Sequence, residues 1–424
     1  MRAGTSNAAG HELSACLSQR WDAPMAEIKI KSREELIYLL SEAAEIEHGV
    51  ACSYLFAAFT MKNDASEGLS EDQLAAVQRW RRVLLQVAGQ EMTHLTLASN
   101  MLTAIGAAPQ LRRPNFPAGS GYYPDGFALV ATPFDEETLQ HFLFIERPEG
   151  MEMDDGSIYR APGQPHPDPV ASSDVTAEPR AFATIGELYH AIEDGFRHLS
   201  ERLRPDTLFI GPPRAQATSD YFSFDELLAV VDLATAIEAI ETIVEEGEGA
   251  RGDIENSHYG RFLAVQEEYE QILAADADFK PSRPVLANPF TRVPSDSPDV
   301  NLIDDPFSVE VCDLFDDCYE VLLQMLARFF AHTEETTTEL KALADATGSS
   351  KPLSVASPAD VNSNVLPAHS SRTTLETSTC PGSARSVMRA ASWTAVPKRS
   401  SSSAIGSPAL MPMRTRTSPP SSSR

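Results

Sequence analysis

Residues 84–102 read LLQVAGQEMTHLTLASNML, and this stretch decides the fold. Small and apolar side chains recur there, and just before it, every three or four residues or at multiples of that spacing: Val77, Leu84, Ala88, Leu95, Ala98 and Leu102. Because an α-helix repeats every 3.6 residues, these side chains form one stripe along a helix, which the pattern predicts over 71–105. Gly106 follows directly and is suited to end that helix. One carboxylate, that of Glu91, lies inside the apolar stripe.

A second helix with the same property precedes it, at residues 33–62. Its apolar stripe consists of Leu36, Leu40, Ala43, Val50 and Tyr54, and Glu47 lies within it. This segment contains no proline and a single glycine, so nothing interrupts the helical pattern. Two successive long helices are therefore predicted, and each carries a carboxylate where the protein interior should begin.

The rest of the body is also helical in pattern. Five further helices are predicted at 136–145, 182–204, 224–246, 255–275 and 308–345. No alternating pattern typical of a β-strand is present over any length. Residues 107–180 are rich in Pro, Gly and Asp and predict a long inserted loop region. The predicted fold class is all-α: a four-helix bundle with extra helices and this insertion.

The two ends of the chain differ from the body, which spans 25–345. Residues 1–24 are small and polar, and are expected to be disordered or a mis-assigned start. Residues 346–424 form a Ser/Thr/Pro-rich tail that is basic, with nine Lys and Arg against two Asp and Glu from position 351 onward. Such a composition cannot bury enough apolar area to fold, so the tail is expected to be disordered or artefactual.

Composition excludes several classes of function. The chain of 424 residues has 61 Asp and Glu against 34 Lys and Arg, a formal net charge of −27. This balance argues against nucleic-acid binding and against docking on an anionic membrane. No apolar run approaches the roughly 20 residues of a membrane span. Five cysteines without paired spacing indicate neither a disulfide scaffold nor a zinc site, and a cytoplasmic location is expected.

The carboxylates inside the apolar stripes carry the functional prediction. An ionised carboxylate is costly to bury unless it is paired or binds a metal. Glu91 and His94 are three residues apart and lie on one helix face. Carboxylate-bridged di-iron and di-manganese bundles use single Glu residues and Glu-x-x-His pairs that point inward. Glu47, Glu91 and His94 therefore predict half of such a metal site, with iron favoured and manganese allowed.

The other half of the site stays open on periodicity alone. Glu241 lies in the apolar stripe of its helix, and Glu245 lies one turn later, whereas Glu187 lies roughly opposite the stripe of its own helix. The full set of candidates is Glu187 with His190, Glu193, Glu241, Glu245 and His258. His141 has no nearby partner in the sequence and is expected at the surface.

A series of motifs, in order along the chain, resembles a known family: Glu45-Ile-Glu-His48, Tyr54-Leu-Phe-Ala-Ala58, Glu91-Met-Thr-His-Leu95, Leu102-Thr-Ala-Ile-Gly106, Arg113-Pro-Asn-Phe-Pro117, Thr184-Ile-Gly-Glu-Leu-Tyr189, Ile243-Val-Glu-Glu-Gly-Glu-Gly249 and Ser257-His-Tyr259. Together they resemble the ferritin-like domain of the iminophenyl-pyruvate dimer synthase family, over about 25–345. The resemblance implies a stand-alone member with these metal ligands: Glu47, Glu91, His94, Glu187, Glu245 and His258.

The resemblance also implies a function. Members of this family couple two amino-acid-derived imines oxidatively in violacein- and rebeccamycin-type bisindole pathways. The expected function is a non-haem di-iron oxidase or oxygenase of secondary metabolism that takes a small-molecule substrate and dioxygen. A homo-oligomer is allowed. The alternatives are a ferroxidase or other iron-handling protein, and a helical binding module that holds no metal.

Overall fold

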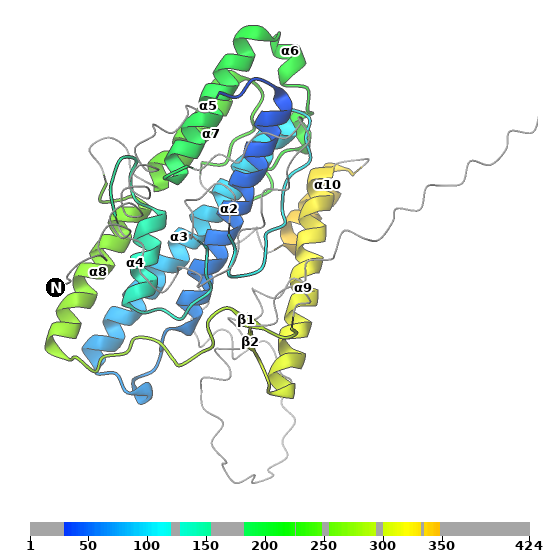
Figure 1. The fold of residues 1–424 in the computed structure, drawn as a ribbon. Helices are drawn as coiled ribbons and strands as arrows, with labels where there is room; N and C mark the ends of the chain where they lie inside the picture. Colours follow the sequence, from blue (N-terminus) through cyan, green and yellow to red (C-terminus); the bar gives the residue numbers. More distant parts are fainter. Residues whose placement is uncertain are drawn as a thin grey trace, which may run out of the picture.

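The structure is a computed structural model, and it describes residues 29–119, 128–153, 182–224, 226–247, 254–293, 300–331 and 335–347. Figure 1 shows a helical protein built around two long helices. The predicted termini, 1–24 and all but the first two residues of 346–424, lie outside the described residues. Helices cover most of the described chain, so the predicted all-α fold class is confirmed.

The two long helices are α2 (Arg33–Thr60) and α3 (Glu71–Ala104), which pack against each other more extensively than any other pair of described elements. Both begin at a serine whose side chain accepts a backbone hydrogen bond, Ser32 for α2 and Ser70 for α3. Such caps satisfy N–H groups that the first helical turn leaves unpaired. Their facing sides are buried over almost their whole length, which makes this pair the first layer of the bundle.

The second layer consists of two shorter pairs rather than two long helices. One pair is α4 with α8, and the other is α5 with α7; their bounds are α4 (Glu136–Ile145), α5 (Ile185–Arg202), α7 (Leu233–Gly247) and α8 (His258–Ala275). Figure 1 shows the two pairs at different levels along α2 and α3. Trp80 near the start of α3 donates to Glu268 of α8 at 2.7 Å, whereas Gly195 of α5 lies against Ile30, just before α2. Each pair therefore covers one end of the long hairpin.

The two pairs meet near the middle of α2 and α3. Helix α4 ends there at Ile145 with Glu146 as its C-cap, α7 ends at Gly247, and α8 begins at His258 after the N-cap Ser257. Three helix termini thus converge on the level of the bundle where the two long helices carry Glu47 and Glu91. The break in the second layer is what positions the site described below.

Smaller elements complete the described fold. Helices α9 (Pro306–Ala331) and α10 (Thr337–Ala346) pack on each other beside the bundle (Figure 1). The short elements are η1 (Ala65–Glu67), α6 (Pro205–Leu208), η3 (Pro213–Ala215) and the parallel two-residue strands β1 (Pro289–Phe290) and β2 (Asn301–Leu302). Among the helices of the described ranges, none combines the length and the apolar character needed to cross a membrane.

Three predictions about the helices need correction. The single helix expected at 308–345 is two helices, because Thr336 caps a new one with its side chain and a capping box. The helix expected from 224 begins only at Leu233, where the Asp232 side chain accepts a hydrogen bond from Thr235 N. His141, expected at the surface, is fully buried in α4.

Two glycines give a matched test of how tightly the bundle is packed. A Cβ on Gly211 would lie 1.7 Å from the carbonyl oxygen of Thr103, at the C-terminal end of α3. A Cβ on Gly89, inside α3, would have no neighbour within 4 Å. We expect Gly211→Ala to lower the free energy of unfolding by about 1–3 kcal/mol or more. We expect Gly89→Ala to raise it by about 0.5–1 kcal/mol, because alanine favours a helix interior.

Urea denaturation followed by circular dichroism measures both changes. A loss of stability in both variants, or in neither, would contradict the packing described for these two positions.

Candidate metal centre

Six side chains converge where the three helix termini meet the two long helices: Glu47, Glu91, His94, Glu146, Glu246 and His258. Glu47 comes from the middle of α2, and Glu91 and His94 come from successive turns of α3. The remaining three come from the ends of α4, α7 and α8. All except the half-buried Glu246 are buried, and His258 is fully so. The bundle has therefore placed four carboxyl groups and two imidazoles in its interior.

Glu91 is the centre of this cluster. Its Oε2 is 3.0 Å from Nδ1 of His94, and its Oε1 is 2.9 Å from Nδ1 of His258. The two imidazole rings stack with their centroids 5.4 Å apart, and each ring contacts one oxygen of the Glu91 carboxylate. Each oxygen of Glu91 thus lies next to an imidazole nitrogen, so Glu91 could take part in binding two metal ions.

The other carboxylates lie around this core. Nδ1 of His94 is 3.7 Å from Oε2 of Glu47, and its Nε2 is 2.8 Å from Oε2 of Glu246. Nδ1 of His258 is 3.5 Å from Oε2 of Glu146. Ligand atoms lie within 4.8 Å of one another in three overlapping sets: Glu47, Glu91 and His94; Glu91, Glu146 and His258; and His94, Glu246 and His258.

Unsatisfied polar atoms within the cluster fit a cation. Oε1 of Glu91 and Nδ1 of His258 lie at ion-pair distance, yet neither makes a hydrogen bond of good geometry. Nε2 of His258 also has no hydrogen-bond partner among the described residues. A buried polar atom without a partner costs about 1–3 kcal/mol. Nitrogen and oxygen lone pairs directed at a shared space are what a bound metal ion would satisfy, so the residues present fit such an ion.

Hydrogen bonds from outside the cluster orient its carboxylates. The hydroxyl of Tyr189 donates to Oε1 of Glu47 at 2.7 Å, and the hydroxyl of Tyr54 donates to Oε1 of Glu146. Both tyrosines are fully buried. Such outer hydrogen bonds fix the orientation of metal-binding groups. Tyr54, part of the apolar stripe of α2, thus carries its hydroxyl to Glu146 at the end of α4.

Burial raises the pKa values of two carboxyl groups of the cluster, whereas mutual charge raises those of the imidazoles and lowers that of Glu91. Burial raises the pKa of Glu47 to about 7, and burial also raises the pKa of Glu146. Burial opposes protonation of His258, but the charge of Glu91 outweighs it and raises the pKa of His258 to about 9. For the same reason the pKa of His94 lies well above its usual value, and that of Glu91 lies below its own. Without a metal, the cluster therefore holds protons on its imidazoles.

Four of the six ligands that the resemblance implied lie in this cluster: Glu47, Glu91, His94 and His258. The structure does not bring Glu187 or Glu245 into it. Oε2 of Glu187 accepts a hydrogen bond from Ala183 N at 2.8 Å, so this carboxylate caps the start of α5. Glu245 is exposed and lies one residue away from the position that faces the cluster.

The alternatives left open by the sequence also lie elsewhere. Three residues are concerned: His190, Glu193 and Glu241. His190 is exposed and pairs with Glu149 at 2.9 Å. Glu193 pairs with Arg197 one turn later on α5, at 2.5 Å. Glu241 is exposed on α7.

Sequence reasoning missed Glu146 and Glu246. Glu146 directly follows the apolar run of α4 that ends at Ile145, so a carboxylate after a buried helix was a usable signal. Glu246 shares its turn with Glu245, and only the end of α7 decides which of the two faces inward. Its Oε1 accepts a hydrogen bond from Nε2 of Gln90 at 2.7 Å.

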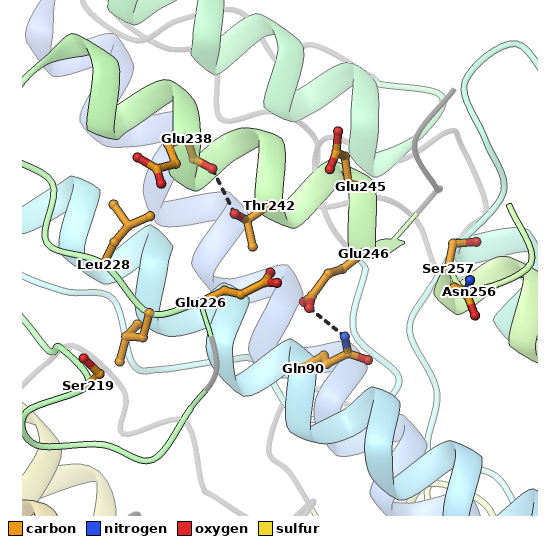
Figure 2. A pocket seen from close by; sticks show the side chains of 11 residues that line it. Gln90, Ser219, Glu226, Leu228, Glu238, Thr242, Glu245, Glu246, Asn256 and Ser257 are labelled. Carbon is orange, nitrogen blue, oxygen red and sulfur yellow. Dashed lines mark hydrogen bonds between the residues drawn. The ribbon is translucent and has the colours of Figure 1, made fainter. Parts of the chain in front are cut away.

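A pocket opens onto this side of the cluster. It has a volume of about 820 Å³ and reaches Glu246, so the cluster has a route to bulk solvent. Figure 2 shows Glu246 held by Gln90 on one side of the pocket and Glu226 on the opposite side. The size is that of a typical small-molecule site.

Comparison with known proteins adds relatives to this geometry. A family model described as Ferritin-like matches residues 40–267. The 2-imino-3-(indol-3-yl)propanoate dimerase of Chromobacterium violaceum is 27% identical over 334 residues, which cover 73% of this chain and 30% of that protein. Dichlorochromopyrrolate synthase of Lentzea aerocolonigenes is 27% identical over 368 residues, which cover 76% of this chain and 34% of that protein. The chain thus spans about a third of the length of these curated relatives.

A solved structure, the crystal structure of a ferritin like protein from Caulobacter vibrioides, aligns with a TM-score of 0.48 and 17% identity, over 76% of this chain and 96% of that one. The resemblance predicted from the sequence motifs is confirmed by the family model and by the two curated relatives. Because the family model covers more than half of the chain, the protein belongs to the ferritin-like family.

Proposed function

We propose that this chain is a di-metal oxidase, with iron as the favoured metal, that acts on an amino-acid-derived small molecule in secondary metabolism. The single observation that carries this proposal is the buried cluster in which Glu91 faces both His94 and His258. The printed names of the curated relatives, a dimerase of an imino acid and a chromopyrrolate synthase, support the substrate class.

The donor atoms favour iron or manganese over other metals. The cluster offers four carboxyl groups and two imidazoles, and no cysteine of the described chain joins it. Mixed oxygen and nitrogen donors suit these metals, whereas structural zinc sites are commonly rich in thiolate. Glu47, Glu91 and His94 would hold one ion, and Glu91, Glu146 and His258 would hold the other. Glu246 would close the side that faces the pocket.

A bound pair of iron ions would supply the electrons and the dioxygen-binding position that an oxidase needs. The protein's own residues do the rest. Tyr189 and Tyr54 hold the carboxylates of Glu47 and Glu146 in place through their hydroxyl groups. Gln90 holds Glu246 at the boundary between the cluster and the pocket. The buried walls of the bundle exclude water from the other sides of the site.

Oxidative coupling of two imines is the reaction that the relatives suggest. This chain spans only about a third of those proteins, so we propose the oxidation itself as the task of this domain. The pocket of about 820 Å³ is large enough for one aromatic small molecule beside the cluster.

Iron content distinguishes the ligands found in the structure from those implied by the resemblance. We expect the full-length chain to bind close to two iron ions. Glu146→Gln and Glu246→Gln should each lower the iron content, because an amide oxygen is a weaker, uncharged ligand. Glu187→Gln and Glu245→Gln should leave it unchanged, because neither side chain reaches the cluster.

Iron content is measured by inductively coupled plasma mass spectrometry after anaerobic loading and desalting. Circular dichroism of each variant shows whether it is folded. Equal losses in both pairs of variants, or no bound iron in the parent protein, would contradict the proposed centre.

The stability of the metal-free protein should depend on pH. The pKa of His258 is raised from 6.5 to about 9 by the charge of Glu91, against the opposing effect of burial. The folded metal-free protein therefore binds this proton more tightly than the unfolded chain does. The resulting stabilisation is complete below about pH 6.5 and is lost as pH rises through 9, a loss of about 3 kcal/mol. Glu47, with its pKa raised by burial to about 7, acts in the same direction between pH 4.5 and 7.

Denaturation of the metal-free protein at several pH values measures this slope. In a His258→Gln variant, the loss of stability above pH 6.5 that comes from His258 should be absent. Iron binding near pH 7 should release protons, which calorimetry in buffers of different ionisation enthalpy detects. A metal-free protein whose stability rises between pH 7 and 9 would refute the assignment.

A further inference from the structure

The pocket beside the cluster has a charge that the name of the dimerase relative does not predict. We propose that it binds a protonated amine on an apolar body, and that this chain therefore takes a cationic substrate rather than an imino acid carboxylate. The inference rests on the proposed function, because it names the substrate class of that same site. Its basis is the set of side chains around the pocket, taken with their partners.

The pocket wall is acidic. Four glutamates line it: Glu226, Glu238, Glu245 and Glu246. No Lys, Arg or His of the described chain lines it. The other lining residues are Gln90, Ser219, Leu227, Leu228, Thr242, Asn256 and Ser257. Figure 2 shows the carboxylates of Glu226 and Glu246 pointing toward one another across the space. Like charges that face each other are stabilised by a cation between them. A carboxylate-bearing ligand would meet repulsion on the same wall.

Among the described residues, the positive charge near this wall already has partners within the protein. Arg261 lies behind the wall, where its Nη2 donates to Oε1 of Gln90 at 2.5 Å and its Nε donates to the carbonyl of Ser257 at 3.3 Å. The same Gln90 donates to Glu246. These bonds fix Gln90 and Glu246 and leave the guanidinium bound to the protein rather than aimed at a ligand.

The size and the apolar part of the wall distinguish an organic cation from a metal ion. A volume of about 820 Å³ greatly exceeds that of a hydrated ion, and Leu227 and Leu228 add an apolar face. Polar side chains of Thr242 and Ser219 complete the lining. An ammonium group near the glutamates with an aromatic ring on the leucines would use both parts of the pocket.

A second observation ties the pocket to the reacting centre. Glu246 lines the pocket and is also a member of the cluster, and His258 of the cluster directly follows the lining residue Ser257. A ring nitrogen of His258 and a carboxylate oxygen of Glu246 belong to one group of candidate ligand atoms within 4.8 Å of one another, with His94 as the third member. A ligand in the pocket would therefore lie directly against Glu246 and the centre behind it.

The test uses three probes of matched size on the full-length chain: 2-phenylethylamine, 3-phenylpropionate and 2-phenylethanol. Isothermal titration calorimetry at low ionic strength should show the amine binding at least tenfold more tightly than the carboxylate. A Glu226→Gln, Glu238→Gln double variant should weaken the amine by about threefold to tenfold, and added salt should do the same. Glu241→Gln is the control, because Glu241 is exposed on α7, the helix that carries Glu238, and does not line the pocket.

Iron content measured on the same samples separates this inference from the proposed function. The double variant should keep its iron, because neither glutamate belongs to the cluster. Retained iron with equal or tighter binding of 3-phenylpropionate, or with no binding of the amine, would overturn the inference and leave the metal centre standing. Loss of iron in the double variant would show that these glutamates serve the metal instead.

Discussion

The structure depends on one constraint, the burial of the Glu91 carboxylate between two imidazoles. Glu91 is almost fully buried, so its charge must be balanced by His94 and His258, which lie 3.0 and 2.9 Å from its two oxygens. Removing one partner from a buried charge typically costs about 3–5 kcal/mol. Such a group lowers the stability of the bundle, and the unsatisfied atoms around it fit a bound cation.

The interruption of the second layer allows the bundle to surround this buried carboxylate with further polar side chains. Two unbroken helices would offer side chains only at fixed helical intervals. The ends of α4, α7 and α8 instead bring Glu146, Glu246 and His258 to one level of the bundle. The same interruption leaves a pocket beside Glu246. The candidate metal ligands and the pocket thus have one structural origin.

Periodicity predicted the cluster residues inside the long helices, whereas two of the three cluster residues at helix ends were missed. Glu47, Glu91 and His94 lie inside long regular helices, where the 3.6-residue repeat determines which side chains face inward. Glu146 and Glu246 lie at helix termini, where the direction of a side chain depends on where the last turn stops. The resemblance favoured Glu245 over Glu241, whereas Glu246 is the residue that faces the cluster. A shift of a single residue changes the facing direction by about 100°. Glu187 shows the opposite case, because periodicity placed it away from the apolar stripe and the structure uses its carboxylate as a cap.

Anomalous X-ray diffraction at the iron absorption edge, from crystals of the iron-loaded chain, tests the central claim most directly. The account predicts two anomalous peaks about 3.5–4 Å apart, the usual spacing of two-metal sites. One should lie within bonding distance of Glu47, Glu91 and His94, and the other within bonding distance of Glu91, Glu146 and His258. An iron-loaded crystal with no peak in this cluster, or with its peaks at surface carboxylates, would contradict the account.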